Sequence, residues 1–225
     1  MTDTVTLLDS AEHRDLRVRA PAGPLPYFVP VVAAEFAAAA AACPLLLAKD
    51  AETGRFYAGA MLGFQPGESL VELRAGEGFW PLHVERQGFF IAGDSIAIDP
   101  QDSRFTHQDG EPLFGADGAP APALRGIQQT LAQLHRGLEA TQAFVDAMLG
   151  HKLVEPIDIT LRFDDGTSLD LAGLYTISLD ALDALDDAAV VTLFRAGHLQ
   201  LAYAMASSLR QVAVLAARRN RRLAA

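Results

Sequence analysis

Cysteine is nearly absent from this chain of 225 residues, in which Cys43 is the only one. A single thiol excludes an internal disulfide framework and any zinc site built on several cysteines. Basic residues are also few, since 18 Lys and Arg stand against 28 Asp and Glu for a formal net charge of −10. Non-specific nucleic-acid binding requires cations that neutralise phosphates. We therefore expect no nucleic-acid partner.

The chain also lacks a long uninterrupted apolar segment. Residues 29–47 are interrupted by Glu35 and Pro44, and residues 199–217 are interrupted by Arg210. A membrane-spanning helix needs ~20 predominantly apolar residues, so both segments are predicted to form buried helices. The first ten residues show neither the basic nor the apolar region of a secretory signal. We expect a cytoplasmic protein.

The positive charge gathers at the end of the chain. Five arginines lie in the last sixteen residues: Arg210, Arg218, Arg219, Arg221 and Arg222. Residues 1–209 then carry 13 basic and 28 acidic side chains, a net charge of −15. One interpretation is a solvated helix end whose cations complement the helix dipole. The other is a docking tail for an anionic surface, either a partner protein or lipid headgroups.

Composition divides the chain into two halves. Residues 21–122 are rich in proline, glycine and short apolar runs, which indicates strands and loops. Residues 123–225 nearly lack proline and are predicted to be helix-rich, with one β-hairpin at 157–177 around Asp164-Asp-Gly166. The length suits one compact domain. We expect an α+β fold in which residues 1–225 form a single domain, with a small curled antiparallel sheet in the N-terminal half.

Local patterns predict individual elements. Helices are expected at residues 31–42, 123–149, 178–185, 186–196 and 198–219. Strands are expected at residues 45–48, 55–64 and 69–73, and an antiparallel pair at 80–85 and 88–99. The irregular stretch 100–122 is predicted to be a functional loop or a connector.

The sequence contains no dinucleotide-binding glycine motif, no P-loop and no Gly-x-Ser-x-Gly nucleophile motif. A metal site is one hypothesis, because His83 and Glu85 would share one face of a strand and His107 follows in the next loop. Two histidines and a carboxylate are a known ligand set for iron, and the same residue types bind zinc. The alternative is that this spacing arises by chance. Asp109 could stand in place of His107 in that ligand set. Asp94, Asp99 and Asp102 lie near His107 and serve either general acid-base chemistry or the turns in which they lie.

Aromatic residues concentrate in the first half as adjacent pairs. Successive side chains of a strand point to opposite faces, so some of these rings are expected to be exposed. An exposed aromatic surface suits peptide or glycan binding. The predicted binding surface comprises Phe79, Trp80, Phe89, Phe90, Asp102 and Asp109. Cys43, which precedes a proline, is predicted to be a buried structural thiol.

Several segments, taken in order, resemble the SapC family of Gram-negative bacteria, which is named from a surface-layer locus. The resemblance rests on Phe28-Val-Pro-Val-Val-Ala-Ala-Glu-Phe36, Ala48-Lys-Asp-Ala-Glu-Thr-Gly54, Gly59-Ala-Met-Leu-Gly-Phe64, Gln65-Pro-Gly-Glu68, Gly110-Glu-Pro-Leu-Phe114, Leu174-Tyr175 and Gly197-His-Leu-Gln-Leu-Ala-Tyr-Ala-Met-Ala-Ser-Ser-Leu209. It implies an association with surface-layer or transport loci, including genes near TonB-dependent receptors and flavin-dependent tryptophan halogenases. The resemblance assigns no catalytic residue to this chain.

The resemblance predicts a non-enzymatic accessory or binding protein of an envelope uptake or surface-layer system, without a cofactor and with a protein partner in an envelope, halogenase-linked or TonB-linked system. The alternative is a metal-dependent oxygenase or hydrolase that holds iron or zinc with His83, Glu85 and His107. Whether the chain is an enzyme, and what its oligomeric state is, stay open at this point.

Overall fold

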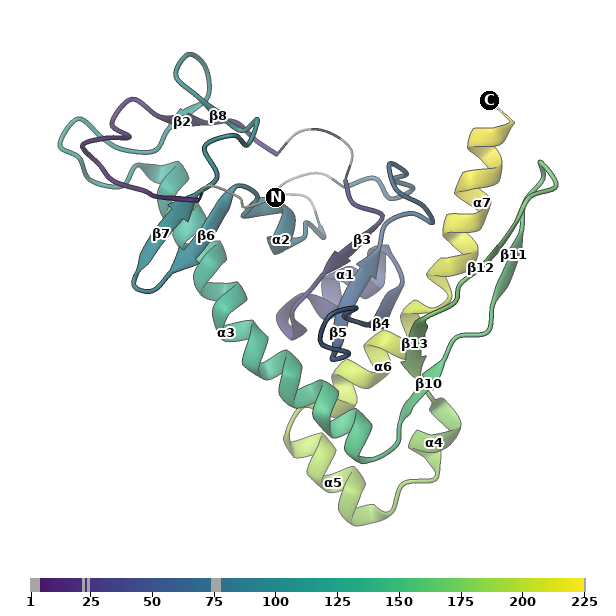
Figure 1. The fold of residues 1–225 in the computed structure, drawn as a ribbon. Coiled ribbons are helices and arrows are strands. Elements are labelled where there is room, and N and C mark those ends of the chain that lie inside the picture. The colour runs from purple at the N-terminus through teal and green to yellow at the C-terminus, as the bar shows by residue number, and fades with distance from the viewer. Residues whose placement is uncertain (1–4, 22, 24, 74–77, 225) are drawn as a thin grey trace. The chain divides into compact units, whose positions relative to one another are not determined.

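A computed structural model describes residues 5–21, 23, 25–73 and 78–224. The chain divides into two compact units, each built from two separate stretches. Unit 1 comprises residues 1–23 and 82–136, and unit 2 comprises residues 24–81 and 137–225. Helix α3 (Pro122–Gly150) is continuous and contributes to both units (Figure 1). The units therefore do not follow the compositional division near residue 122.

Unit 1 contains a small antiparallel sheet in the order β1-β7-β6. Its strands are β1 (Thr6–Leu7), β7 (Ser95–Ile98) and β6 (Phe89–Ala92). The expected pairing of residues 80–85 with 88–99 is wrong. Residues 89–98 form a hairpin by themselves around Gly93, whose φ of +61° favours glycine. Pro81 precedes a short helix instead, α2 (Leu82–Glu85), because proline is favoured at a helix start.

A second sheet of unit 1 has the order β8-β2-β9. Its two-residue strands are β8 (Phe105–Thr106), β2 (Arg17–Val18) and β9 (Glu111–Pro112). One cluster of buried side chains joins strands of both sheets to the first half of α3. Its buried members are Leu16, Val18, Phe89, Ile98, Leu113, Leu124, Ile127 and Leu131. The stretch 100–122, expected to be irregular, thus supplies two strands and part of this core.

Unit 2 is built on an antiparallel sheet in the order β10-β13-β4-β5-β3. Its strands are β10 (Val154–Pro156), β13 (Leu174–Ile177), β4 (Leu45–Lys49), β5 (Phe56–Met61) and β3 (Phe28–Pro30). Leu45, Leu46 and Leu47 are fully buried, as a continuous apolar run predicts for a central strand. Residues 69–73, all of them described, form no strand, which corrects that expectation.

The predicted helix at residues 31–42 is present as a 3₁₀ turn (Ala33–Glu35) followed by α1 (Phe36–Ala42). The carboxylate of Glu35 accepts a hydrogen bond from the Val32 N–H at 2.9 Å, which satisfies a donor at the helix start. Pro44 follows the helix, as expected. The buried rings of Phe36 and Phe144 pack edge to face with centres 5.5 Å apart, which joins α1 to the second half of α3.

The second stretch of unit 2 confirms most of the local predictions. The predicted hairpin is present as β11 (Thr160–Arg162) paired with β12 (Ser168–Asp170) and continues as the pair β10-β13. Helices α4 (Leu179–Asp183) and α5 (Asp187–Arg195) begin after the N-caps Ser178 and Asp186.

The predicted helix at 198–219 is two helices, α6 (His198–Ser208) and α7 (Gln211–Leu223). Helix α6 packs against α1, β4 and β13, whereas α7 leaves much of its surface exposed. Among the described residues, no helix is both long enough and apolar enough to span a membrane. Mixed helices and small antiparallel sheets confirm the α+β class.

Candidate functional site

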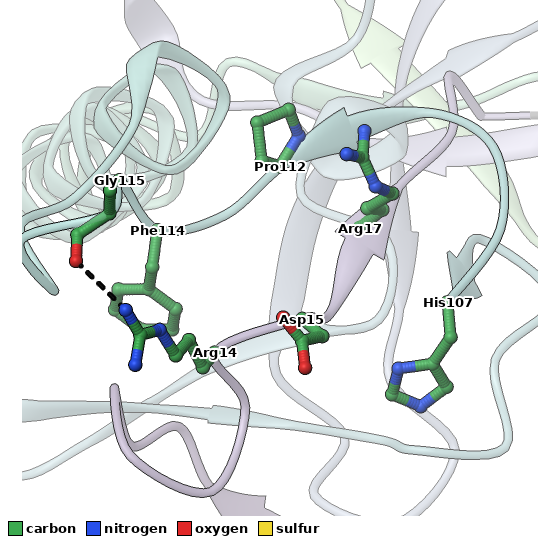
Figure 2. A pocket seen from close by; sticks show the side chains of 8 residues that line it. Arg14, Asp15, Arg17, His107, Pro112, Phe114 and Gly115 are labelled. Carbon is green, nitrogen blue, oxygen red and sulfur yellow. Dashed lines mark hydrogen bonds between the residues drawn. The ribbon is translucent and has the colours of Figure 1, made fainter.

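An open pocket of about 660 Å³ lies in unit 1, against the sheet β8-β2-β9. Figure 2 shows the side chains around it. The lining residues are Arg14, Asp15, Arg17, His107, Pro112, Phe114, Gly115 and Ala116.

Strand alternation places Arg17 at the pocket. Leu16 and Val18 are buried in the core of unit 1, so the residue between them points to the opposite face of the sheet. Arg17 pairs with Thr106 on one side and with Pro112 on the other. The sheet thereby brings together segments that are far apart in the sequence.

Both pocket arginines are held by backbone carbonyl groups. Arg14 donates from Nη2 to the carbonyl oxygen of Ala116 at 3.1 Å, and Arg17 donates from Nη1 to that of Gly110 at 2.8 Å. Each bond engages one nitrogen of a guanidinium group that carries five N–H donors. The two side chains are therefore oriented by the fold and retain donor capacity for a ligand.

The pocket is positive within an acidic chain. Its lining includes two guanidinium groups and the imidazole of His107 but one carboxylate, that of Asp15 (Figure 2). Guanidinium groups match the planar, paired acceptors of carboxylates and phosphates. The half-buried ring of Phe114 adds an apolar wall. This arrangement can bind an anionic group that is attached to a less polar body.

His83 and Glu85 do not share the face of a strand, because both lie in helix α2. Two positions apart on a helix, their side chains diverge by about 200°. Burial, and then the charge of Arg86, lower the pKa of His83 to about 4. Arg86 donates from Nη2 to Nε2 of His83 at 2.9 Å, so this ring nitrogen serves as an acceptor from a cation.

His107 lines the open pocket. Among the described residues, which include all three predicted ligands, no group of three His, Cys, Asp or Glu side chains gathers in a way that could hold a metal ion. The structure thus does not bring His83, Glu85 and His107 together as a ligand set.

The four predicted surface rings divide by burial and by unit. Phe79 in unit 2 is 5% exposed and Phe89 in unit 1 is fully buried, so both are core residues. Trp80 is half-buried in unit 2. Phe90 is half-buried in unit 1, where the guanidinium of Arg86 lies 5.2 Å from its ring centre. The rings that remain accessible are Trp80 and Phe90.

Asp102 stabilises the loop in which it lies through hydrogen bonds. Its carboxylate accepts hydrogen bonds from the Arg104 N–H at 2.9 Å and from Nε2 of Gln87 at 3.1 Å. The buried Arg104 side chain in turn donates to the carbonyl oxygens of Arg19, Glu85 and Gln87. These bonds tie the loop to α2 and β2, which is a structural role.

Asp109 is exposed and paired with Arg19. Nε of Arg19 lies 3.1 Å from each carboxylate oxygen, and this hydrogen bonding lowers the pKa of Asp109. The pair lies beside Gly110, whose carbonyl oxygen orients Arg17. Asp109 therefore borders the segment that shapes the pocket.

The sequence interpretation did not single out Arg14, Asp15 or Arg17. The available signal was the segment Arg14-Asp-Leu-Arg-Val-Arg19, which is locally basic within the acidic body of the chain. Two-residue strands carry no periodic pattern that would have placed these side chains.

Two of the C-terminal arginines are engaged within unit 2. Arg218 donates to the carbonyl oxygen of Leu70 at 3.0 Å, and the Arg219 guanidinium lies over the ring of Phe163. Arg221 and Arg222 are exposed on α7. The basic cluster therefore includes residues that hold α7 in place.

Comparison with known proteins yields one family. No curated protein and no solved structure matches the chain. A family model described as SapC matches residues 8–215, which includes the pocket, the sheet β8-β2-β9 of unit 1 and the sheet of unit 2. A match over this share of the chain confirms the resemblance, and the chain belongs to the SapC family.

Proposed function

We propose that this SapC family chain is a non-enzymatic accessory or binding protein of an envelope uptake or surface-layer system, and that its unit 1 pocket recognises an anionic group of the ligand. The observation that carries the binding role is the pocket itself. Arg14 and Arg17, each held by a carbonyl group, line it together with His107.

The charge distribution supports an anionic ligand. The chain carries a net charge of −10, so most of its surface repels anions. The pocket differs from the rest of this negatively charged surface, because its lining has two guanidinium groups and one carboxylate. Arginine also offers paired donors in one plane, which suits a carboxylate or phosphate group.

The binding role can be tested by NMR titration with inorganic phosphate and with acetate, using sodium chloride at equal ionic strength as the reference. We expect the amide resonances of residues 14–17 and 107–116 to shift saturably. The double variant Arg14→Gln, Arg17→Gln should weaken binding at least tenfold. The matched control is Arg125→Gln, because Arg125 is exposed and also donates to a carbonyl oxygen, that of Pro120, outside the pocket lining.

Two results would contradict the pocket proposal. One is equal phosphate and acetate binding by the wild type and the double variant. The other is an equal loss in Arg125→Gln, since that would indicate a general effect of positive charge.

The cellular part of the proposal is a cytoplasmic protein with a protein partner in an envelope system. Family membership supports the association, and the exposed Arg221 and Arg222 offer a contact for an anionic partner or membrane surface. Cell fractionation tests the location. Cross-linking in cells with wild type and an Arg221→Gln, Arg222→Gln variant, followed by mass spectrometry, identifies partners that depend on these cations. Recovery of the protein outside the cytoplasmic fraction would contradict the location.

A further inference from the structure

Helix α5 (Asp187–Arg195) carries an exposed apolar face in unit 2. Phe194 is 72% exposed, the highest value among the exposed large apolar side chains of the described residues. Val190 and Val191 are 37% and 46% exposed. Leu193 is the one buried residue of the helix, so α5 rests on unit 2 by a narrow edge and presents most of its circumference outward.

The exposed residues share one helical face. At about 100° per residue, positions 190, 191 and 194 fall within an arc of about 100°, and the buried position 193 lies about 60° outside that arc, on the side of Val190. Asp187 and Arg195 lie on the same side and are both exposed. The face therefore reads, along the helix, as an acidic residue, three apolar residues and a basic residue.

This charge order is self-complementary. If two copies of α5 pack antiparallel about a two-fold axis near Val191, Asp187 of each copy lies opposite Arg195 of the other. A parallel arrangement would instead set like charges together. Isologous interfaces of soluble homodimers require such self-complementarity.

We propose that the exposed face of α5, formed by Asp187, Val190, Val191, Phe194 and Arg195, is a self-association surface for a second copy of this chain. A nine-residue helix is about 14 Å long. Two such helices cover less than the ~1,200 Å² of a typical stable interface. The dimer is accordingly weak and concentration-dependent.

Sedimentation velocity of the full chain from about 10 µM to 1 mM tests this proposal. We expect the wild type to shift from monomer to dimer across the range. Phe194→Glu should raise the dissociation constant at least tenfold, because it places two carboxylates at the interface. Leu138→Glu is the matched control, since Leu138 is 61% exposed on α3 in the same unit, and it should leave association unchanged.

Charge exchange tests the antiparallel alignment. Asp187→Arg alone and Arg195→Asp alone should each weaken the dimer about three- to tenfold, because exposed ion pairs are individually weak and each change affects two symmetric contacts. The double exchange should restore association to within about threefold of the wild type. Circular dichroism checks that each variant is folded, and Phe194→Ser replaces Phe194→Glu if that variant is not.

Several outcomes would overturn the proposal. A wild type that stays monomeric at 1 mM excludes a second copy as the occupant and leaves this face to a different protein. Association that survives Phe194→Glu, or that Leu138→Glu weakens equally, places the dimer contact elsewhere. A double exchange as weak as the single variants excludes the antiparallel pairing.

Discussion

The guanidinium of Arg219 lies 4.2 Å from the centre of the Phe163 ring, and its side chain is 14% exposed. Its Nε is also 3.8 Å from Oε1 of Glu68, which is 13% exposed. The other carboxylate oxygen of Glu68 accepts a hydrogen bond from the Phe64 N–H at 2.8 Å. One arginine of α7 thus joins the turn at 65–68 to the end of strand β11, all within unit 2.

Arg219→Ala should lower the free energy of unfolding by about 1–3 kcal/mol, because it removes a cation-π contact and leaves Glu68 without its cation. The unfolding free energy of Arg219→Lys should lie between those of the wild type and Arg219→Ala, since lysine keeps the charge but not the planar stacking group. Urea unfolding measures both. The exposed Arg222→Ala serves as control and should change stability by less than about 0.5 kcal/mol. Equal stability of the two alanine variants would refute this role.

Ser208→Ala should cost about 1–3 kcal/mol of stability, the range expected when a buried donor loses its acceptor. The buried hydroxyl of Ser208 accepts from the Leu45 N–H at 2.8 Å and donates to the Met205 carbonyl oxygen at 2.6 Å. The Ser208 hydroxyl therefore links α6 to Leu45, the first residue of the central strand β4. Ser207→Ala is the control, because the Ser207 side chain is exposed. Chemical denaturation that finds the two variants alike would contradict the assignment.

Cys43 should be inert in the folded protein. Burial raises the pKa of its thiol to about 12, so the reactive thiolate is scarce at neutral pH. We expect a disulfide reagent such as DTNB to label Cys43 at least a hundredfold more slowly in native buffer than in 6 M guanidinium chloride. Rapid labelling of the native protein would show that the buried site opens readily.

Stability should fall as the pH drops from about 6.5 toward 4, in part through His83. Burial and the adjacent Arg86 lower the folded-state pKa of His83 to about 4 from its usual 6.5. In this window the unfolded chain binds a proton that the folded chain does not, so acidification favours unfolding. His83→Gln should reduce the difference in unfolding free energy between pH 7 and pH 4.5. An unchanged difference in that variant would exclude His83 as the source.

The elements that could be predicted from the sequence are those with a local cause. The 3-4 spacing of apolar residues predicted α3. Ser178, and either Asp186 or Asp187, were the predicted N-caps of the next two helices, and the structure has Ser178 and Asp186. Residues 80–85 were misassigned because Trp80 and Val84 favour a strand. In the structure Pro81 immediately precedes α2, and the buried Arg104 donates to the carbonyl oxygen of Glu85 at the end of that helix.

Several motifs that carried the family resemblance have structural roles in the fold. Gly59 in β5 lies against the ring of Phe28, and a Cβ there would come within 2.2 Å of it. Glu68 binds Arg219, and Ser208 binds Leu45. The motif at residues 110–114 supplies Pro112 and Phe114 to the pocket lining, whereas Arg14 and Arg17 lie outside every motif. Motif recognition therefore led to the family, to much of its packing and to one wall of the pocket, but not to its arginines.

The sequence by itself determined the family, the α+β class, the capped helices and the 157–177 hairpin, because propensity, periodicity and turn chemistry act between neighbours in the chain. Only the tertiary structure decided that Phe79 and Phe89 are buried and that Arg14, Arg17 and His107 share a pocket. Those placements depend on the pairing of β2 with strands distant in sequence, and on which face of that small sheet the core of unit 1 covers.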